Sequence, residues 1–175
     1  MNHIPVILIV IGILVFWIIK TQSYLVGLED NNTKAMSQIG VQISSQWEVL
    51  NSLFIIIPDH SAQRQESILK IMAARHCITK DSSPEDLRIQ EDLIAQALEK
   101  IKGVAEANPD LKAQQDYINA IDAMNQYKKM METSKLIYDD SAWNFNRKIR
   151  KFPTVLIARA LGFLARDYFN DEKSK

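Results

Sequence analysis

The hydrophobic pattern divides the chain into an apolar start and a longer amphipathic part. The run Ile4–Ile19 carries no charge, and Lys20 is the first charged residue after it. The run is shorter than the roughly 20 residues that usually cross a bilayer, but Trp17 and Lys20 can anchor at the interface and uncharged neighbours extend the span. It therefore predicts a membrane-spanning helix. The residues assigned to this span are Ile4, Leu8, Ile11, Leu14, Trp17 and Ile19.

A cleaved signal peptide is the alternative interpretation of the same segment. No Lys or Arg precedes the apolar run, and the residues that follow its core show no small-x-small cleavage pattern. Both features favour an uncleaved anchor over residues 1–22. Lys20 and Lys34 follow the run while no basic residue precedes it, so the positive-inside tendency favours a cytoplasmic over an extracellular or periplasmic domain.

Beyond the anchor, apolar residues recur every three or four positions, which is the period of an amphipathic helix. The first stripe predicts a helix over residues 23–57. Its members are Leu28, Ala35, Ile39, Ile43, Trp47, Leu50, Phe54 and Ile57. Pro58 ends this helix because it lacks a backbone donor, and Asp59 can cap a second helix that fades near Thr79. The apolar residues of the second helix are Ile68, Leu69, Met72 and Ala73.

Two more helices are predicted from proline-containing starts. Ser83-Pro84-Glu85-Asp86 combines a capping hydroxyl, a proline at the first helical position and two carboxylates. The stripe of this third helix is Leu87, Ile94, Leu98, Ile101 and Ala105. Asn108-Pro109-Asp110 has the same combination of a capping residue, a proline and a carboxylate, and it begins the longest predicted helix. Its stripe is Tyr117, Ile121, Met124, Met131, Tyr138, Ala142, Phe145, Ile149 and Phe152.

Short connections between these helices imply antiparallel neighbours. We therefore expect an all-α fold in which an N-terminal transmembrane helix precedes an antiparallel four-helix bundle over residues 23–153, with long first and last helices. In that topology the fourth helix returns towards the membrane. Pro153 ends or kinks it, and residues 154–175 form an amphipathic tail near the bilayer.

Composition narrows the classes of function. Lys plus Arg balance Asp plus Glu at 21 each, so no global positive field favours nucleic acid. Cys77 is the only cysteine, which excludes an internal disulfide. The histidines His3, His60 and His76 have no metal-ligand spacing, so we expect neither a metal nor a cofactor. No catalytic constellation is recognisable, and we expect no enzyme.

A basic cluster before Pro153 is the main candidate for a binding surface. Its members, together with two arginines further on, are Arg147, Lys148, Arg150, Lys151, Arg159 and Arg166. Because apolar residues lie between them, this tail can contact anionic lipid. Alternatively, the tail packs its apolar face on the base of the bundle and leaves its charges in water.

Several polar residues interrupt the last stripe. Asn144 and Asn146, near Tyr138, either line a polar site between helices or form a hydrogen-bonded register device. Asp139 and Asp140 point about 100° apart on a helix, so they form no acid/base pair, and we expect a solvated face there. Met130 and Met131 are expected as core filler.

Three stretches of the chain carry distinctive motifs: an anchor-proximal Tyr24 with the Ser37–Ile43 core, the Asn-Pro-Asp-Leu-Lys-Ala start at residues 108–113, and a closing pattern from Tyr138 to Phe169. In their order and spacing these stretches resemble the LemA family of bacterial membrane proteins. The matching positions are Tyr24, Ser37, Ile39, Val41, Pro109, Leu111, Tyr138, Asn144, Asn146, Phe152, Pro153, Gly162, Phe163 and Phe169. The chain departs from the pattern at residues 44–53 and at Met36, where the family usually has Trp.

The resemblance implies a membrane helix followed by a four-helix bundle with bromodomain-like topology, and no established enzyme activity. We therefore expect a non-enzymatic membrane-anchored scaffold or adaptor. The alternative is a sensor or regulatory subunit that transmits a signal to a membrane enzyme. The expected partners are the lipid bilayer and other membrane proteins or helical peptides, with no nucleic acid, and the sequence leaves a homo-oligomer open.

Overall fold

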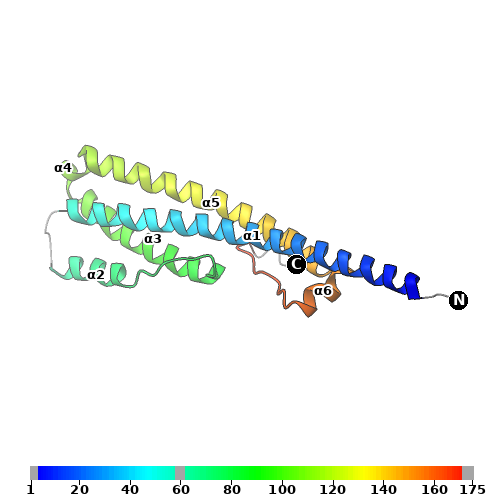
Figure 1. The fold of residues 1–175 in the computed structure, drawn as a ribbon. Coiled ribbons are helices and arrows are strands. Elements are labelled where there is room, and N and C mark those ends of the chain that lie inside the picture. Colours follow the sequence, from blue (N-terminus) through cyan, green and yellow to red (C-terminus); the bar gives the residue numbers. More distant parts are fainter. Residues whose placement is uncertain (1–3, 58–61, 171–175) are drawn as a thin grey trace. The chain divides into compact units, whose positions relative to one another are not determined.

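A computed structural model describes residues 4–57 and 62–170. In these residues the protein is built from six α-helices and contains no strand, which confirms the all-α prediction (Figure 1). The helices are α1 (Ile4–Ile56), α2 (Ala62–Ala73), α3 (Pro84–Glu106), α4 (Pro109–Lys112), α5 (Gln115–Ile149) and α6 (Thr154–Ala160).

The first helix, α1, is a single helix of 53 residues that contains both the predicted anchor and the predicted first helix of the domain. It is long and apolar enough to cross a membrane, and its apolar window is 0% buried. A core helix of a soluble protein would bury that window, so α1 is a candidate membrane anchor. The exposed side chains include Leu8, Ile11, Leu14, Trp17 and Ile19, whereas the side chain of Ile4 lies outside the described part.

Contacts between residues group the chain into two compact units. Unit 1 comprises residues 1–33 and 137–175, and unit 2 comprises residues 34–136. Both boundaries fall inside helices, so α1 and α5 each contribute to both units. The domain limits at residues 22/23 and 153/154 stay a prediction from the sequence. The two units are described separately below.

The core of unit 2 follows the predicted stripes closely. On α1 the predicted residues from Ala35 to Leu50 are buried, and Met36 and Leu53 join them. Residues seven positions apart are also buried on two further helices. They are Leu87, Ile94 and Ile101 on α3, and Tyr117, Met124 and Met131 on α5. Burial at such spacing is what ridge-into-groove helix packing requires.

The start of α3 has the predicted cap. The Ser83 hydroxyl accepts the Asp86 backbone N–H at 3.1 Å, and the Asp86 carboxylate accepts the Ser83 backbone N–H at 2.8 Å. These reciprocal bonds satisfy two donors that the first turn would otherwise leave without a partner. The bonds from the Ser83 backbone and side chain lower the pKa of Asp86 below its ordinary value of 3.8.

The second helix is shorter than predicted. It ends at Ala73 rather than near Thr79, and Leu69 is exposed. The chain beyond it is not helical and buries Ile78, whose backbone carbonyl lies so close to Gly40 that a Cβ there would overlap it. Burial of the Ile78 side chain replaces the further turn of helix that the pattern predicted. The predicted break at Pro58 and cap at Asp59 lie outside the described residues.

The prediction that Asn108 opens the longest helix is wrong. Asn108 precedes only the four-residue α4, and α5 begins at Gln115. The Asn108 side-chain amide donates to the Val104 carbonyl at 2.8 Å, so it serves the end of α3 instead of capping α4. Helix α5 then ends at Ile149, before the predicted limit.

The chain after α5 also differs from the prediction. Phe152, predicted on the buried stripe, is 81% exposed because α5 has already ended and no longer turns this residue towards the core. A cis peptide bond joins it to Pro153, which precedes the short α6. Residues 163–170 beyond α6 are not helical, so the tail is amphipathic only over a short helix.

Candidate functional site at the C-terminal tail

In unit 1, an extended C-terminal segment packs against α5. Asn146 is 2% exposed and bonds the backbone of Arg166 twice: its amide donates to the carbonyl at 2.8 Å and its carbonyl oxygen accepts the N–H at 2.8 Å. The same amide donates to the Tyr168 hydroxyl at 3.0 Å. The buried amide therefore supplies bonds that a neighbouring strand would supply in a sheet. This observation favours the register-device interpretation of Asn146 over a vacant polar site.

Asp139 holds the next part of the same segment. Its two carboxylate oxygens accept the backbone N–H groups of Phe169 at 2.8 Å and Asn170 at 3.1 Å. Asp139 is 1% exposed, so the prediction that it lies on a solvated face is wrong. Asp140, in contrast, is exposed. The reason is that Asp139 lies seven residues before Asn146, on the same buried side of α5.

Aromatic contacts fill the space around these hydrogen bonds. The rings of Tyr138 and Phe169 meet edge to face with centroids 5.0 Å apart, and those of Phe145 and Phe163 with centroids 6.1 Å apart. Burial raises the pKa of Tyr138 above its ordinary value of 10.0, so this tyrosine stays protonated at neutral pH. Leu25, Phe145, Ile149 and Ala158 form the core of this unit, with Leu28 and Phe163 packed against it.

Two charged contacts tie the tail and the end of α5 to α1. Arg166 forms an ion pair with Glu29 at 2.6 Å, and both side chains are about one third exposed. The Lys148 ammonium lies 5.3 Å from the centre of the Tyr24 ring. Of the six basic residues predicted to contact lipid, Arg166 and Lys148 thus have partners on α1.

The remaining basic residues lie near large apolar side chains that face outwards. Arg147, Arg150, Lys151 and Arg159 are exposed, and Arg147 stacks over the Trp143 ring at 4.3 Å. Phe152 is 81%, Leu156 61% and Leu164 79% exposed. We call the set Phe152, Leu156, Leu164, Arg150, Lys151 and Arg159 the α6 surface.

The family-motif residues have mixed environments. Ile39 and Leu111 are buried, whereas Ser37, Val41 and Asn144 are exposed. Pro109 occupies the first turn of α4. Gly162 has φ of +78° and ends α6, with the Phe163 N–H bonded to the Ala158 carbonyl at 2.9 Å. This glycine turn aims Phe163 into the core of unit 1.

Sequence reasoning missed two members of the tail site, Asp139 and Glu29. A signal for Asp139 was present, because it falls three residues before Ala142 and seven before Asn146 on the stripe of α5. Glu29 gave no signal, since its partner Arg166 lies 137 residues away in the sequence.

A second polar cluster lies in the core of unit 2. The Gln90 side-chain carbonyl accepts the Trp47 indole N–H at 3.2 Å and the His76 backbone N–H at 3.1 Å. Its amide nitrogen is 2.8 Å from Nδ1 of His76. Gln90 is fully buried, so this one amide connects α1, α3 and the irregular segment after α2. Nearby, Lys135 pairs with Glu91 at 2.6 Å.

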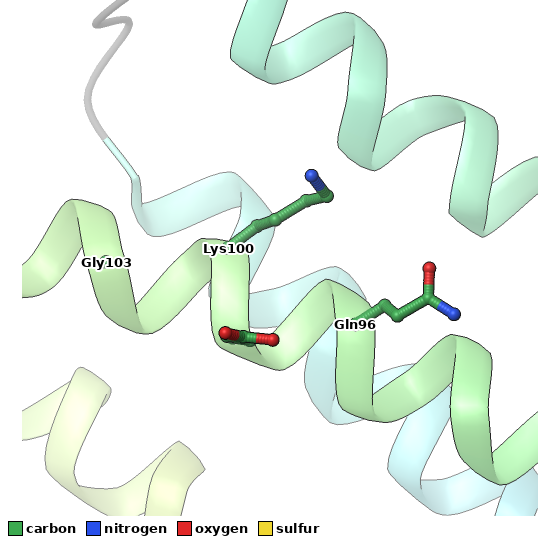
Figure 2. A pocket seen from close by; sticks show the side chains of 4 residues that line it. Gln96, Lys100 and Gly103 are labelled. Atoms are coloured by element: carbon green, nitrogen blue, oxygen red, sulfur yellow. The ribbon is translucent and has the colours of Figure 1, made fainter.

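A pocket lies beside α3 in the same unit. Figure 2 shows Gln96 and Lys100 projecting from successive turns of α3, with Gly103 one turn further along. Glu99 also lines the pocket. All four residues are exposed, so this is an accessible helix face with one charge of each sign. In the described part of the chain, no group of three His, Cys, Asp or Glu residues could hold a metal ion.

The helices and the docked tail define an all-helical protein with a candidate membrane anchor at its N-terminus. The sequence model of the LemA family matches residues 35–175, from the second half of α1 to the C-terminus, and the protein belongs to the LemA family. A search of curated proteins found no match.

Proposed function

We propose that this LemA-family protein is a single-pass membrane protein whose helical domain acts as a non-enzymatic scaffold or adaptor. The observation that carries the proposal is the two-part character of α1, which begins with exposed apolar side chains and continues into the buried core of the domain. Because no loop interrupts the 53 residues of this helix, an anchor there would hold the domain close to the bilayer.

We further propose that unit 2 is a four-helix bundle with the bromodomain-like topology of its family. Four contacts support pairwise packing of its helices. Trp47 on α1 bonds Gln90 on α3, and Lys135 on α5 pairs with Glu91 on α3. Gln46 on α1 donates to the Met131 sulfur on α5 at 3.6 Å, and α2 packs against α3.

The use of the buried polar groups supports a structural rather than a catalytic role. Three polar side chains are nearly inaccessible to solvent, those of Gln90, Asp139 and Asn146. All three form hydrogen bonds with neighbouring segments of the same chain. Groups that catalyse must instead reach the reacting atoms of a substrate. A bundle of this kind offers helical faces to membrane proteins, helical peptides or a second copy of the chain.

Photocrosslinking in native membranes tests the adaptor role. Photoreactive residues replace Gln96 and Lys100, whose side chains are exposed on α3 (Figure 2), and a third replaces Leu14 on the proposed anchor. We expect discrete protein adducts from the α3 positions and lipid adducts from Leu14. Absence of protein adducts at both α3 positions, together with lipid adducts at Leu14, would contradict the adaptor role while leaving the anchor intact.

The side of the membrane can be tested with the native thiol. Cys77 is the only cysteine in the sequence, and it is exposed. A cytoplasmic domain predicts that a membrane-impermeant maleimide labels Cys77 after lysis and not in intact cells. Labelling of intact cells would place the domain on the opposite side.

A further inference from the structure

We propose that the α6 surface is a second membrane contact, which lies in the headgroup region of an anionic bilayer. The inference rests on the proposed function, because the anchor brings lipid to unit 1. It adds to that function a second and chemically distinct lipid site, about 130 residues further along the chain.

Contacts within unit 1 indicate how far the α6 surface would lie from the hydrocarbon part of the bilayer. Lys20 marks the charged end of the apolar run, and Tyr24 follows after about 6 Å of helix at 1.5 Å per residue. A headgroup layer is about 5–8 Å thick on each side of the hydrocarbon. Lys148 lies against the Tyr24 ring, and Arg166 is paired with Glu29, about 7.5 Å further along α1 at 1.5 Å per residue. The end of α5 and the tail are therefore fixed beside the part of α1 that would leave the bilayer.

The two sides of α6 differ in a way that fits an interface. Ile157 and Ala158 are buried against the protein, whereas Leu156 and Arg159 face outwards. Phe152 before the helix and Leu164 after it are each about four fifths exposed, at 81% and 79%. Outward aromatic and leucine side chains next to basic residues are typical of segments that lie in the plane of a membrane surface.

The charge of this region favours anionic lipid. Residues 141–165 contain no Asp or Glu, although the whole chain is neutral. The basic residues in this stretch are Arg147, Lys148, Arg150, Lys151 and Arg159. An acidic protein partner would account for the charges, but a bilayer also accounts for the exposed apolar side chains and for their position beside the anchor.

Depth measurements on the full chain test the proposal. In a Cys77→Ser background, single cysteines replace Phe152, Leu156 or Leu164, Leu14 in the anchor, or Ile55, which is 73% exposed in unit 2. Each carries an environment-sensitive fluorophore, and the protein is reconstituted into vesicles of phosphatidylcholine with phosphatidylglycerol that contain lipids spin-labelled at a shallow acyl position. We expect strong quenching at the three α6-surface positions and at Leu14, and little quenching at Ile55.

The possible outcomes separate the inference from the anchor on which it depends. Quenching at Leu14 without quenching at Phe152, Leu156 and Leu164 would overturn the second contact and keep the anchor. Equal absence of quenching at all positions would overturn both. If an added acidic protein changes the fluorescence at the three positions and lipid does not quench it, the surface binds protein and the proposal is wrong.

The electrostatic part has its own test. The triple substitution Arg150→Gln, Lys151→Gln and Arg159→Gln should reduce quenching at Leu164 in anionic vesicles, and a larger fraction of phosphatidylglycerol should be needed to restore it. The matched control replaces the exposed Lys102, Lys128 and Lys129 of unit 2 with Gln. Equal quenching of wild type and triple variant at every lipid composition would overturn the role of these charges.

Discussion

Asp139 and Asn146 bond a segment of chain that has neither helix nor strand of its own. Between them they bond the backbone of Arg166, Phe169 and Asn170 at distances of 2.8 to 3.1 Å. Gln90 plays the same part for the backbone of His76 in unit 2. A buried polar group left without a partner costs more than its hydrogen bond contributes, so each of these side chains fixes one arrangement of its neighbours.

Asp139→Asn should loosen the tail. The substitution removes the charge and one acceptor, and hydrogen bonds to a charged group contribute about 1.5–3 kcal/mol. We expect the amide hydrogens of Phe169 and Asn170 to exchange faster by at least about tenfold. The control is Asp122→Asn, which alters an exposed carboxylate of α5. Unchanged exchange at Phe169 would contradict the assigned role of Asp139.

Gln90→Leu should destabilise unit 2. The buried indole N–H of Trp47 and the backbone N–H of His76 would both lose their acceptor, at a cost of about 1–3 kcal/mol each. Denaturant unfolding measures the loss. Gln96→Leu, an equivalent change on the exposed side of the same helix, should alter the free energy of unfolding by less than about 0.5 kcal/mol.

At the level of elements, the sequence predicts well what local chemistry determines. The capping box at Ser83 and the seven-residue stripes of α3 and α5 depend on neighbours within one or two turns. The break between α4 and α5 was missed, because Asn108 bonds the end of the preceding helix instead of the start of its own. The sequence left open whether the tail packs on the bundle, and its polar contacts were missed because their partners lie 20 to 137 residues earlier in the sequence.

The cap of α3 makes a pH-dependent contribution to stability. The pKa of Asp86 is lower in the folded state, so its contribution is present above pH 3.8 and is lost as the pH falls through the lowered folded-state pKa. Ser83→Ala should cost about 1 kcal/mol at neutral pH. It should also flatten the fall in stability below pH 3.8. Ser52→Ala, which removes an exposed hydroxyl on α1, serves as the control for thermal unfolding at each pH.

The turn after α6 should be sensitive to any side chain at Gly162. Its φ of +78° is a conformation that glycine adopts freely and alanine only with strain of about 1 kcal/mol. We expect Gly162→Ala to weaken the packing of Phe163 and to lower the melting temperature by a few degrees. Gly103→Ala is the matched control, since this helical glycine has open space around it and should be neutral or stabilising.

For the whole molecule, α1 is the element on which the functional account depends. It joins an apolar segment that is 0% buried in the described residues to a domain in which Gln90, Asp139 and Asn146 bond neighbouring segments of the same chain. If this segment spans a bilayer, the domain and its docked tail are held at the membrane surface without a flexible linker. In that arrangement the α6 surface would lie at the lipid headgroups.

The most direct test is to extract native membranes with alkaline carbonate and to measure the mass of the protein that stays in the membrane pellet. If α1 spans the bilayer, the full chain of 20.0 kDa remains in the membrane pellet. Release of the protein into the supernatant, or a species shortened by its first two dozen residues, would contradict a spanning α1.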